Sequence, residues 1–573
     1  MNKQKLLAIA RGEEKADLVI KNVKIINVYT KDVDLGNLAI ADGIVIGIGN
    51  YEGENEIDFN GYYLAPGFID GHVHIESSML VPNNYALAVM PRGTTSVIAD
   101  CHEIANVCGT NGIDYMLKSA KASPLDVFMM IPSCVPSSAF ETSGAVLNAD
   151  DIKKYLKEDR VKGLGEMMDY KGAINGEKSV LDKINLFKSL TIDGHAPEVK
   201  EKELNAYILS GVETDHECTT PEELIEKVKK GMYIHLREGS QTKNVLDLLP
   251  GLNPSYYNRI IFCSDDLHPS DIKKIGHMDN NINIAIKYGI DPIEAISMAT
   301  INIANCYNIK SIGALSPGRK ADFVAFKNLD NIDIEYVYKN GVKVAEKKKA
   351  LFETENIVDN KVMNTVNINL NNLDLTYSVK KEYLNVIGLI KNNVTTKSII
   401  EKVVLDNNIF YPKNNPNLLK LVVVERHHAS KNLGKAIVKG YGLKNSAIAM
   451  TVSHDSHNLI CIGDNDLDMM IAIKKISELS GGIVIVSNSK VLDYLKLEVA
   501  GLMSLDSLEF VEKKLNSLVN YARSLGVSNE IEDPLLQLAF LSLAVIPELK
   551  VTDYGLFDVN KFKIISLETS DLS

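Results

Sequence analysis

The sequence predicts an α/β protein in which a (β/α)8 barrel is flanked by a small β-sandwich and followed by a C-terminal α+β domain. Three observations predict this fold class. Short apolar segments alternate with amphipathic ones over residues 63–310, the pattern of parallel strands joined by helical crossovers. Segments that read as alternating strands precede and follow this region, within 1–62 and 311–360. Residues 361–573 mix strands and helices and show no internal repeat.

The sandwich is expected to begin within residues 17–60. The stretches ADLVIKNVKIINVYT and GNLAIADGIVIGIG alternate apolar and polar positions and are separated by turn residues. A similar texture returns at 313–329 and 337–346, where Asn340 and Gly341 form a strong hairpin signal. We expect the two segments to pair into one sandwich that encloses the region between them.

Eight candidate strands follow, each with a helix after it, over about 200 residues, which matches a (β/α)8 barrel. They end near Asp70, Asp100, Pro132, Glu166, Asp193, Asp215, Arg237 and Asp265. The stretch TTPEELIEKVKKG illustrates the helices, with Thr220 as the expected N-cap, Glu223 as its capping-box partner and Gly231 as the stop. The tetrapeptide TDHE before it then lies at the C-terminal end of a strand.

The C-terminal region is expected to form a separate domain of mixed character. LKLVVVE and GGIVIVS read as strands, and DLDMMIAIKKISEL reads as a helix. A chain of 573 residues exceeds what one hydrophobic core supports, so several domains are expected.

Composition excludes several classes of protein. With 45% apolar and 24% charged residues the chain is an ordinary globular one, and its net charge of -12 without a basic run disfavours nucleic acid as a partner. Seven cysteines without C-x-x-C spacing favour the reducing cytoplasm. We find neither an export signal at the N-terminus nor an apolar run long enough to span a membrane.

The sharpest motif is APGFIDGHVHIESS, in which His72 and His74 follow an apolar strand. In an extended chain, residues two apart point to the same side, so both imidazoles can reach one metal ion. The alternative is two unrelated polar residues in a loop. The residues that end the later strands bear on this choice.

Each of several later strand ends carries a group of ligand type. These are Glu166 in GLGEMM, His195 in DGHAP, His216 in TDHE and Asp265 in CSDD. In a (β/α)8 barrel the C-terminal strand ends meet at one mouth, where active sites lie. Any one of these residues could be a hydrogen-bonded loop residue, but the ordered series of H-x-H, Glu, His, His and Asp predicts a metal-dependent hydrolase.

This series, with the strings GHVHIESS, CHEIANV, GEMMDY, DGHAP and SDD, resembles the bacterial adenine deaminases of the amidohydrolase superfamily over nearly the whole chain. The resemblance implies two divalent metal ions, one held by His72, His74 and Asp265 and the other by His195 and His216, with Glu166 bridging. Many cyclic-amide hydrolases of the superfamily have a carbamylated lysine where Glu166 aligns, which favours the deaminase branch. The resemblance points to Mn2+ or Fe2+, while the ligand types would also suit Zn2+.

The activity that the resemblance implies is hydrolysis of adenine to hypoxanthine and ammonia, a purine salvage reaction. Bound metal ions lower the pKa of a water toward neutrality, and Asp265 is expected to accept its remaining proton. When water attacks C6, the electron density displaced from C6 can be accommodated only if N1 of the ring is protonated. Glu103 in CHEIANV is the candidate acid that protonates N1.

His102, Asp266 and Arg237 are candidates for substrate binding. An extra metal ion, or orientation of the other ligands, is an alternative role for His102 and Glu103, and Arg237 could equally pair with Glu238. The strings VVERHHAS and TVSHDSHNLICIGDND add further ligand-type residues, which either line the pocket or form a domain interface: His427, His428, His454, Asp455 and His457.

Two other functions remain open. Another hydrolase of the superfamily, acting on a cyclic amide or imide, would use the same metals but release no ammonia. A metal-binding barrel without turnover is the second alternative, and it gives no reason for a proton acceptor such as Asp265 at the metal. The expected partners are adenine and, as is common for soluble enzymes, further copies of the chain.

Overall fold

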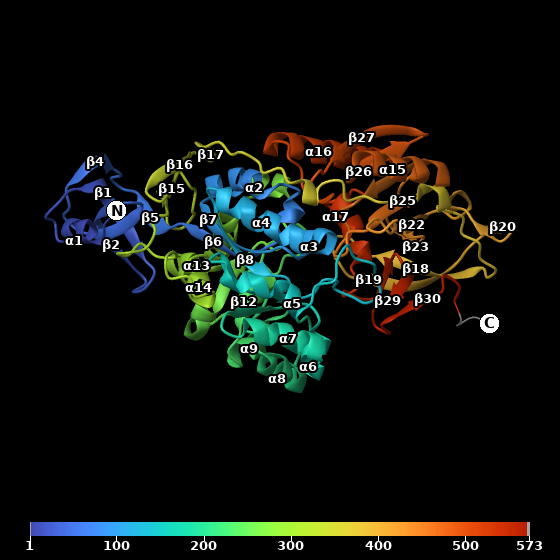
Figure 1. The fold of residues 1–573 in the computed structure, drawn as a ribbon, viewed down its shortest axis with the longest axis horizontal. Coiled ribbons are helices and arrows are strands. Elements are labelled where there is room, and N and C mark those ends of the chain that lie inside the picture. Colours follow the sequence, from blue (N-terminus) through green and yellow to red (C-terminus); the bar gives the residue numbers. More distant parts are fainter. Residues whose placement is uncertain (1, 570–573) are drawn as a thin grey trace.

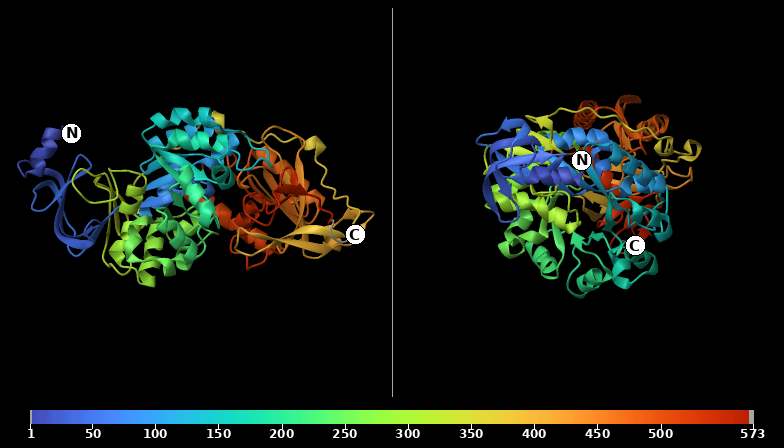
Figure 2. Two further views of the ribbon diagram at one scale, coloured as in Figure 1. Left: turned by 90° about the horizontal axis from the view of Figure 1, so that it is seen from below. Right: turned by 60° about the vertical axis from the view of Figure 1, so that its left-hand side comes forward.

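The computed structural model describes residues 2–569, with Asn372 described by its backbone alone. Its parts lie in a row along the long axis of the molecule (Figure 1). A β-sheet near the N-terminus lies at one end, the barrel in the middle and the C-terminal α/β region at the other end, and the view from below agrees (Figure 2). The barrel therefore has a neighbour at each end.

The N-terminal sheet takes its strands from both flanks of the barrel. The strands before it are β1 (Ala16–Asn27), β2 (Asp32–Ala41), β3 (Ile44–Ile48), β4 (Gly53–Asp58) and β5 (Tyr63–Pro66), and those after it are β14 (Phe323–Phe326), β15 (Tyr336–Lys339), β16 (Val342–Glu346) and β17 (Lys349–Ala350). β5 pairs in parallel with β1 and antiparallel with β14, so one mixed sheet joins the two flanks edge to edge. The expected pairing of the flanks is thus present.

Two details of this sheet bear on the sequence interpretation. Residues 63–66, expected at the start of the barrel, form β5 of the sheet, because the chain turns away only after them. Asn340 and Gly341 join β15 to β16 with φ values of +49° and +75°. These left-handed conformations are those of a type I′ hairpin, as predicted.

The barrel strands are eight among residues 2–569, and they lie where the sequence predicts them. They are β6 (Phe68–Val73), β7 (Thr94–Asp100), β8 (Asp126–Ile131), β9 (Val161–Met167), β10 (Thr191–Gly194), β11 (Thr214–Asp215), β12 (Tyr233–Arg237) and β13 (Ile260–Cys263). All pairings among them are parallel. The helices between and after them include α2 (Pro82–Val89), α3 (His102–Cys108), α4 (Thr110–Ala122), α7 (Lys178–Phe187), α8 (Glu201–Ser210), α9 (Pro221–Lys229), α11 (Pro269–Lys274) and α12 (Met278–Tyr288).

A few backbone hydrogen bonds close the ring between the two parallel sheets. On one side, the N–H of Glu213 donates to the carbonyl of Ile192 at 3.0 Å. On the other side, the N–H of Asp265 donates to the carbonyl of His72 at 2.9 Å, and the N–H of His74 donates to the carbonyl of Asp265 at 3.1 Å. The first and last strands therefore meet at residues that the sequence analysis assigns to the site.

Helix α9 begins as predicted, with one difference. Pro221 is its first residue, and the hydroxyl of Thr220 accepts a hydrogen bond from the N–H of Glu223 at 3.3 Å. The Glu223 carboxylate does not complete a capping box at Thr220 and instead accepts from the N–H of Thr219 at 3.2 Å. The reason is that its other oxygen binds the buried ammonium of Lys227 at 2.7 Å, which draws the side chain away from the cap.

The C-terminal region contains one large mixed sheet with helices packed against it. Its strands are β18 (Tyr383–Leu389), β19 (Thr396–Lys402), β22 (Leu418–Val424), β23 (Leu433–Lys439), β24 (Ser446–Met450), β25 (Leu459–Gly463), β26 (Gly482–Ser487) and β27 (Lys490–Lys496), and its helices are α15 (Asp466–Leu479), α16 (Leu508–Ser524) and α17 (Pro534–Ala539). β22, β26 and α15 are the segments predicted from sequence. A small sheet of β28 (Leu549–Thr552), β29 (Gly555–Asp558) and β30 (Lys563–Ile565) follows.

The C-terminal region is joined to the barrel by polar contacts and by shared core packing. The N–H and hydroxyl of Thr142 donate to the Asp553 carboxylate at 2.9 and 2.6 Å. His268 Nδ1 lies 2.9 Å from Asp533 Oδ2, and Asp533 also caps α17. Barrel and C-terminal side chains belong to one continuous hydrophobic core. The two parts are therefore packed as one body over the barrel mouth.

No helix in the described stretch 2–569 is both long and apolar enough to cross a bilayer. The seven cysteines are free thiols, and six of them are buried.

Candidate metal centre

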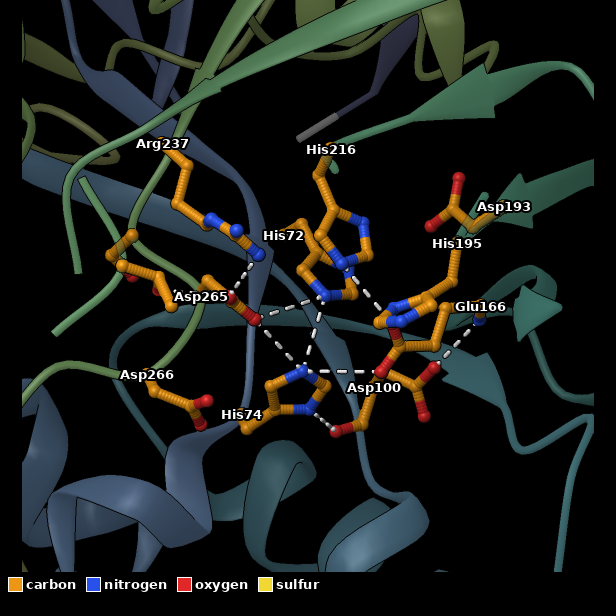
Figure 3. A network of polar contacts seen from close by, with 12 residues as sticks. His72, His74, Asp100, Glu166, Asp193, His195, His216, Arg237, Asp265 and Asp266 are labelled. Atoms are coloured by element: carbon orange, nitrogen blue, oxygen red, sulfur yellow. Dashed lines mark hydrogen bonds and ion pairs between the residues drawn. The ribbon is translucent and has the colours of Figure 1, made fainter. Parts of the chain in front are cut away.

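The structure brings six predicted side chains to one end of the barrel (Figure 3). They lie at or just after the C-terminal ends of five strands: His72 and His74 at β6, Glu166 on β9, His195 after β10, His216 after β11 and Asp265 after β13. All six are buried. Parallel strands deliver their C-terminal ends to one rim, which explains why residues far apart in sequence meet here.

Glu166 lies at the centre of this group. Its Oε2 atom is 2.8 Å from His195 Nδ1 and 3.1 Å from His216 Nε2. Its Oε1 atom is 3.4 Å from His74 Nε2. The two oxygens thus face different histidines, so one carboxylate connects both halves of the group.

Asp265 faces the H-x-H pair from the other side. Its Oδ1 atom is 3.1 Å from His74 Nε2 and 3.6 Å from His72 Nε2, and its Oδ2 atom accepts a hydrogen bond from Arg237 Nη1 at 2.8 Å. Its φ of +59° is unusual for a residue with a side chain, and such conformations cluster at functional sites. The strained backbone points the carboxylate at both imidazoles.

The donor atoms fit divalent cations. His72 Nε2 and His74 Nε2 are 3.1 Å apart, and ligand atoms of three triplets lie within 4.8 Å of one another: His72, His74 and Glu166; His72, His216 and Asp265; and Glu166, His195 and His216. Buried imidazole nitrogens and carboxylate oxygens that converge in this way need a common partner, which a divalent ion supplies. Nitrogen and oxygen donors suit Zn2+, Mn2+ and Fe2+ alike.

For each of the two carboxylates, burial raises the pKa and the neighbouring charges lower it. Burial alone would raise the pKa of Asp265, but Arg237 and the nearby histidines hold that pKa well below its ordinary value. Burial likewise opposes ionisation of Glu166, and His195 and His216 overcome it to lower its pKa. Both groups are therefore carboxylates, the form that binds metal.

Asp100, at the end of β7, orders the ligands from behind. Its Oδ2 atom accepts from the N–H of Glu166 at 2.9 Å, and its carbonyl oxygen accepts from His74 Nδ1 at 3.2 Å. The second contact leaves His74 Nε2 free to face the cluster. The approach requires a glycine, because a Cβ at Gly165 would lie 2.1 Å from Asp100 Oδ2. The sequence analysis used Asp100 only to locate the end of a strand. Its contacts in the structure show that it positions Glu166 and His74.

A buried ion pair supports the two loops that carry His195 and His216. Lys227 Nζ lies 2.9 Å from Asp215 Oδ2 and 2.7 Å from Glu223 Oε1, and all three side chains are buried. Asp215 in turn accepts from the N–H of Ala196 at 2.9 Å. The ammonium of Lys227 therefore compensates carboxylates that hold the ligand loops in place.

Replacing Lys227 by Met should lower the free energy of unfolding by about 3–5 kcal/mol, because the buried carboxylates would lose their cation. Urea unfolding followed by circular dichroism measures this change. Lys229→Met is the matched control, since Lys229 is exposed on the same helix and its loss should change stability by less than about 0.5 kcal/mol. Equal midpoints for the two variants would show that the buried pair does not stabilise the barrel.

Glu217 belongs to the site although the sequence analysis did not select it. Its Oε1 atom lies 3.3 Å from His216 Nε2 and 2.5 Å from Arg237 Nη1. Arg237 thus pairs with Glu217 and Asp265. The alternative considered from the sequence was a pair with Glu238. The sequence feature that could have identified Glu217 is its position in TDHE, directly after the candidate ligand His216.

The other predicted site residues lie around the same cavity. His102 Nδ1 is 3.4 Å from Glu166 Oε1, and Asp266 accepts a hydrogen bond from the hydroxyl of Ser77. The carboxylate of Glu103 binds two histidines of the C-terminal region, His454 and His457. Burial would raise the pKa of Glu103, but His454, His457 and His102 lower it well below its ordinary value.

The cavity is shared between the barrel and the C-terminal region. Its water-accessible volume is about 50 Å3, so the lining side chains enclose it closely. The barrel supplies the polar residues named above. The C-terminal region supplies Val394, His454, Asp455, Phe540, Leu543, Val545 and Ile546. Polar groups on one side and apolar groups on the other suit a flat heterocycle with polar edges.

The structure divides the C-terminal histidine group, whose role the sequence left open. His454 and Asp455 line the cavity, and His457 contacts Glu103. His427 Nε2 instead bonds to the carbonyl of Ser456 at 2.8 Å, and His428 Nε2 bonds to the carbonyl of Ser143 at 3.0 Å. Part of the group therefore belongs to the cavity and part to local and interdomain contacts.

Comparison with known proteins gives strong matches over the whole chain. The model of the amidohydrolase family matches residues 63–344, and that of the adenine deaminase C-terminal domain matches residues 393–563. Adenine deaminase of Clostridium acetobutylicum is 47% identical over 97% of this chain and 98% of its own length. Adenine deaminase 2 of Carboxydothermus hydrogenoformans is 44% identical over 98% of each protein. Among solved structures, atrazine chlorohydrolase TrzN from Arthrobacter aurescens TC1 complexed with zinc is 14% identical, with a TM-score of 0.45. The match covers 58% of this chain and 96% of that chain.

Proposed function

The chain belongs to the adenine deaminases of the amidohydrolase family, and we propose that the cavity at its barrel mouth is the site where adenine is hydrolysed to hypoxanthine and ammonia. The observation that carries this proposal is the convergence of four histidines and two carboxylates from separate strand ends on one buried cavity. The enzyme is a metal-dependent hydrolase of C–N bonds, and its place in purine salvage is consistent with that reaction.

The cofactor is proposed to be two divalent metal ions. His72, His74 and Asp265 would hold one ion and His195 and His216 the other, with Glu166 between them, because its two oxygens face different histidines. Mn2+ or Fe2+ is proposed, and Zn2+ also fits the donor set. When bound, such ions bring the pKa of a water toward neutrality, so that a strong nucleophile exists at physiological pH.

Asp265 is proposed to move the proton of the attacking water. As the water oxygen adds to C6 of adenine, the Asp265 carboxylate accepts the proton, and it later gives that proton to the exocyclic amine, which leaves as ammonia. Arg237 keeps Asp265 ionised and aimed through its hydrogen bond of 2.8 Å. One carboxylate of the chain thus both accepts and returns the proton.

Contacts to the base are proposed for His102, Arg237 and Asp266, which line the cavity. We add Glu217, which lies between His216 and Arg237 and faces the same space. The apolar wall of Phe540 and its neighbours would exclude water from the ring faces.

Reconstitution of the apo-protein tests the proposal directly. We expect ammonia from adenine after addition of Mn2+ or Fe2+ at two equivalents per chain, and none from the apo-protein. Adenosine and a dihydropyrimidine are assayed alongside, because a cyclic-amide hydrolase would open the dihydropyrimidine and release no ammonia from adenine. That second pattern would replace the deaminase by the alternative hydrolase.

We also propose a location, a mode of assembly and domain boundaries for the protein. The cytoplasm is the proposed location, supported by seven free thiols. Assembly with further copies of the chain is proposed from the frequency of symmetric oligomers among enzymes. The proposed domains are 1–62 and 311–360 for the N-terminal sheet, 63–310 for the barrel and 361–573 for the C-terminal region. Strand β5 is assigned to the N-terminal sheet because it pairs with β1 and β14.

A further inference from the structure

The segment after β24 brings a C-terminal histidine to the barrel mouth. His454 lies in this segment, it is 2% exposed, and it lines the cavity together with Asp265 and Asp266. Its neighbour His457, 1% exposed, lies three residues further along. Both histidines contact the carboxylate of Glu103, which stands on α3 of the barrel. His454 and His457 are therefore two buried histidines that share one carboxylate, and their remaining contacts can be compared.

His454 is held in place by three independent contacts. Its N–H donates to the carbonyl of Ala539 at 3.1 Å, and its imidazole stacks on the ring of Phe540 with centroids 4.5 Å apart and planes 9° apart. Its Nδ1 atom lies 2.8 Å from Glu103 Oε1 and donates to that oxygen. The ring orientation is thus fixed before any substrate enters.

The remaining nitrogen of His454 is available to a ligand. His454 Nε2 is buried and has no hydrogen-bond partner within residues 2–569. His457 differs, because its Nδ1 accepts from the N–H of Ser453 at 3.1 Å while its Nε2 binds Glu103. A buried polar atom without a partner is costly, and a substrate atom in the cavity would satisfy it. Of the two histidines, His454 is the one with an atom left for the cavity.

The charge around His454 favours its protonated form. Burial would lower its pKa, but Glu103 on α3, with Asp266 after β13 and Asp455 in its own segment, raises the pKa to about 9. His457 and His102 also face Glu103 and share its charge. At neutral pH, His454 therefore carries a proton on Nε2 as well as on Nδ1. Glu103 itself is a carboxylate and has no proton to give.

We propose that His454 is a catalytic acid contributed by the C-terminal region, which donates a proton from Nε2 to N1 of adenine while Glu103 acts as its positioning residue. This proposal rests on the proposed function. It transfers to His454 the role for which Glu103 was the sequence candidate, and it retains Glu103 as the group that orients and charges the imidazole.

The step balances in atoms and electrons. The water oxygen forms a bond to C6 and its proton goes to Asp265, while the C6–N1 π pair moves onto N1, which takes the proton of His454 Nε2. The C6–amine bond then breaks with its electron pair on the nitrogen, which leaves as ammonia with the proton from Asp265. The C6 hydroxyl becomes a carbonyl, and its released proton replaces the one that His454 gave up.

The test compares His454→Asn with His457→Asn in the metal-loaded, full-length enzyme. We expect kcat for adenine to fall about 10²–10⁴-fold in His454→Asn, the range for loss of one acid–base group, and less than about tenfold in His457→Asn. Metal content should match wild type in both variants, and the thermal midpoints of the two variants should fall by similar amounts, because each change removes one histidine from the buried Glu103 carboxylate. Because the acid is active only when protonated, wild-type kcat should fall as pH rises through about 9. That alkaline limb should be absent from His454→Asn and kept in His457→Asn.

Three results would overturn the proposal. Equal losses of kcat in the two variants would show that both histidines only join the C-terminal region to the barrel through Glu103. Loss of a metal equivalent with His454 would make it a ligand, as the spacing of Glu103, His454 and His457 also allows. An alkaline limb retained in His454→Asn would place the acid elsewhere. Failure of the proposed function is distinguishable, because wild type itself would then release no ammonia from adenine.

Discussion

Glu166→Gln is expected to lose at least about 10⁴-fold in kcat/KM for adenine and to bind fewer than two metal equivalents. An amide can offer one oxygen but carries no charge, whereas the Glu166 carboxylate faces His74 with one oxygen and His195 and His216 with the other. Without that charge, two cations would lie close together with less compensation. Metal analysis after gel filtration, together with ammonia release, measures both effects.

The matched control for Glu166→Gln is Glu238→Gln, which changes a carboxylate directly after strand β12 in the same way. It should keep both metal equivalents and near wild-type kcat/KM. Full metal content in Glu166→Gln would show that Glu166 is not a bridging ligand.

Asp265→Asn is expected to lower kcat by about 10³–10⁴-fold with a much smaller change in KM, because it removes the proton acceptor from the reacting centre. The Asn amide oxygen can still face His72 and His74, so part of the metal should remain. Arg237 would keep Glu217 as its partner, at 2.5 Å from Nη1, so the local fold should persist. Steady-state kinetics with metal content determined on the same sample separates lost chemistry from lost metal.

Asp271→Asn is the control for this change, since Asp271 stands on α11 and accepts a hydrogen bond from Ser240 away from the ligand group. Its kcat should stay within about threefold of wild type, as for most surface-proximal changes. A kcat for metal-loaded Asp265→Asn within tenfold of wild type would remove Asp265 from proton transfer.

The barrel and the rim residues were predictable from local sequence. Strand ends were visible because apolar stretches stop at polar residues, and parallel strands bring all such ends to one rim. This is why His72, Glu166, His195, His216 and Asp265 could be expected together once the barrel was predicted.

Other parts of the site depend on contacts that local sequence does not encode. Glu217 follows a candidate ligand, but its pairing with Arg237 depends on the packing of β11 against β12. Glu103 and His454 are 351 residues apart, and no periodicity relates them. The same holds for Glu223, whose side chain is drawn from the helix cap by the buried Lys227.

The closure of the barrel at Asp265 gives the metal a second consequence. His72 lies on the first barrel strand, His74 directly follows that strand, and Asp265 follows the last one; few backbone hydrogen bonds join them at this point. A cation held by these three side chains would cross-link the two ends of the ring. By mass action, its binding free energy would add to the stability of the closed fold in proportion to RT ln(1 + [M]/Kd). Scarcity of the ion would therefore reduce how much folded protein persists as well as how fast it turns over.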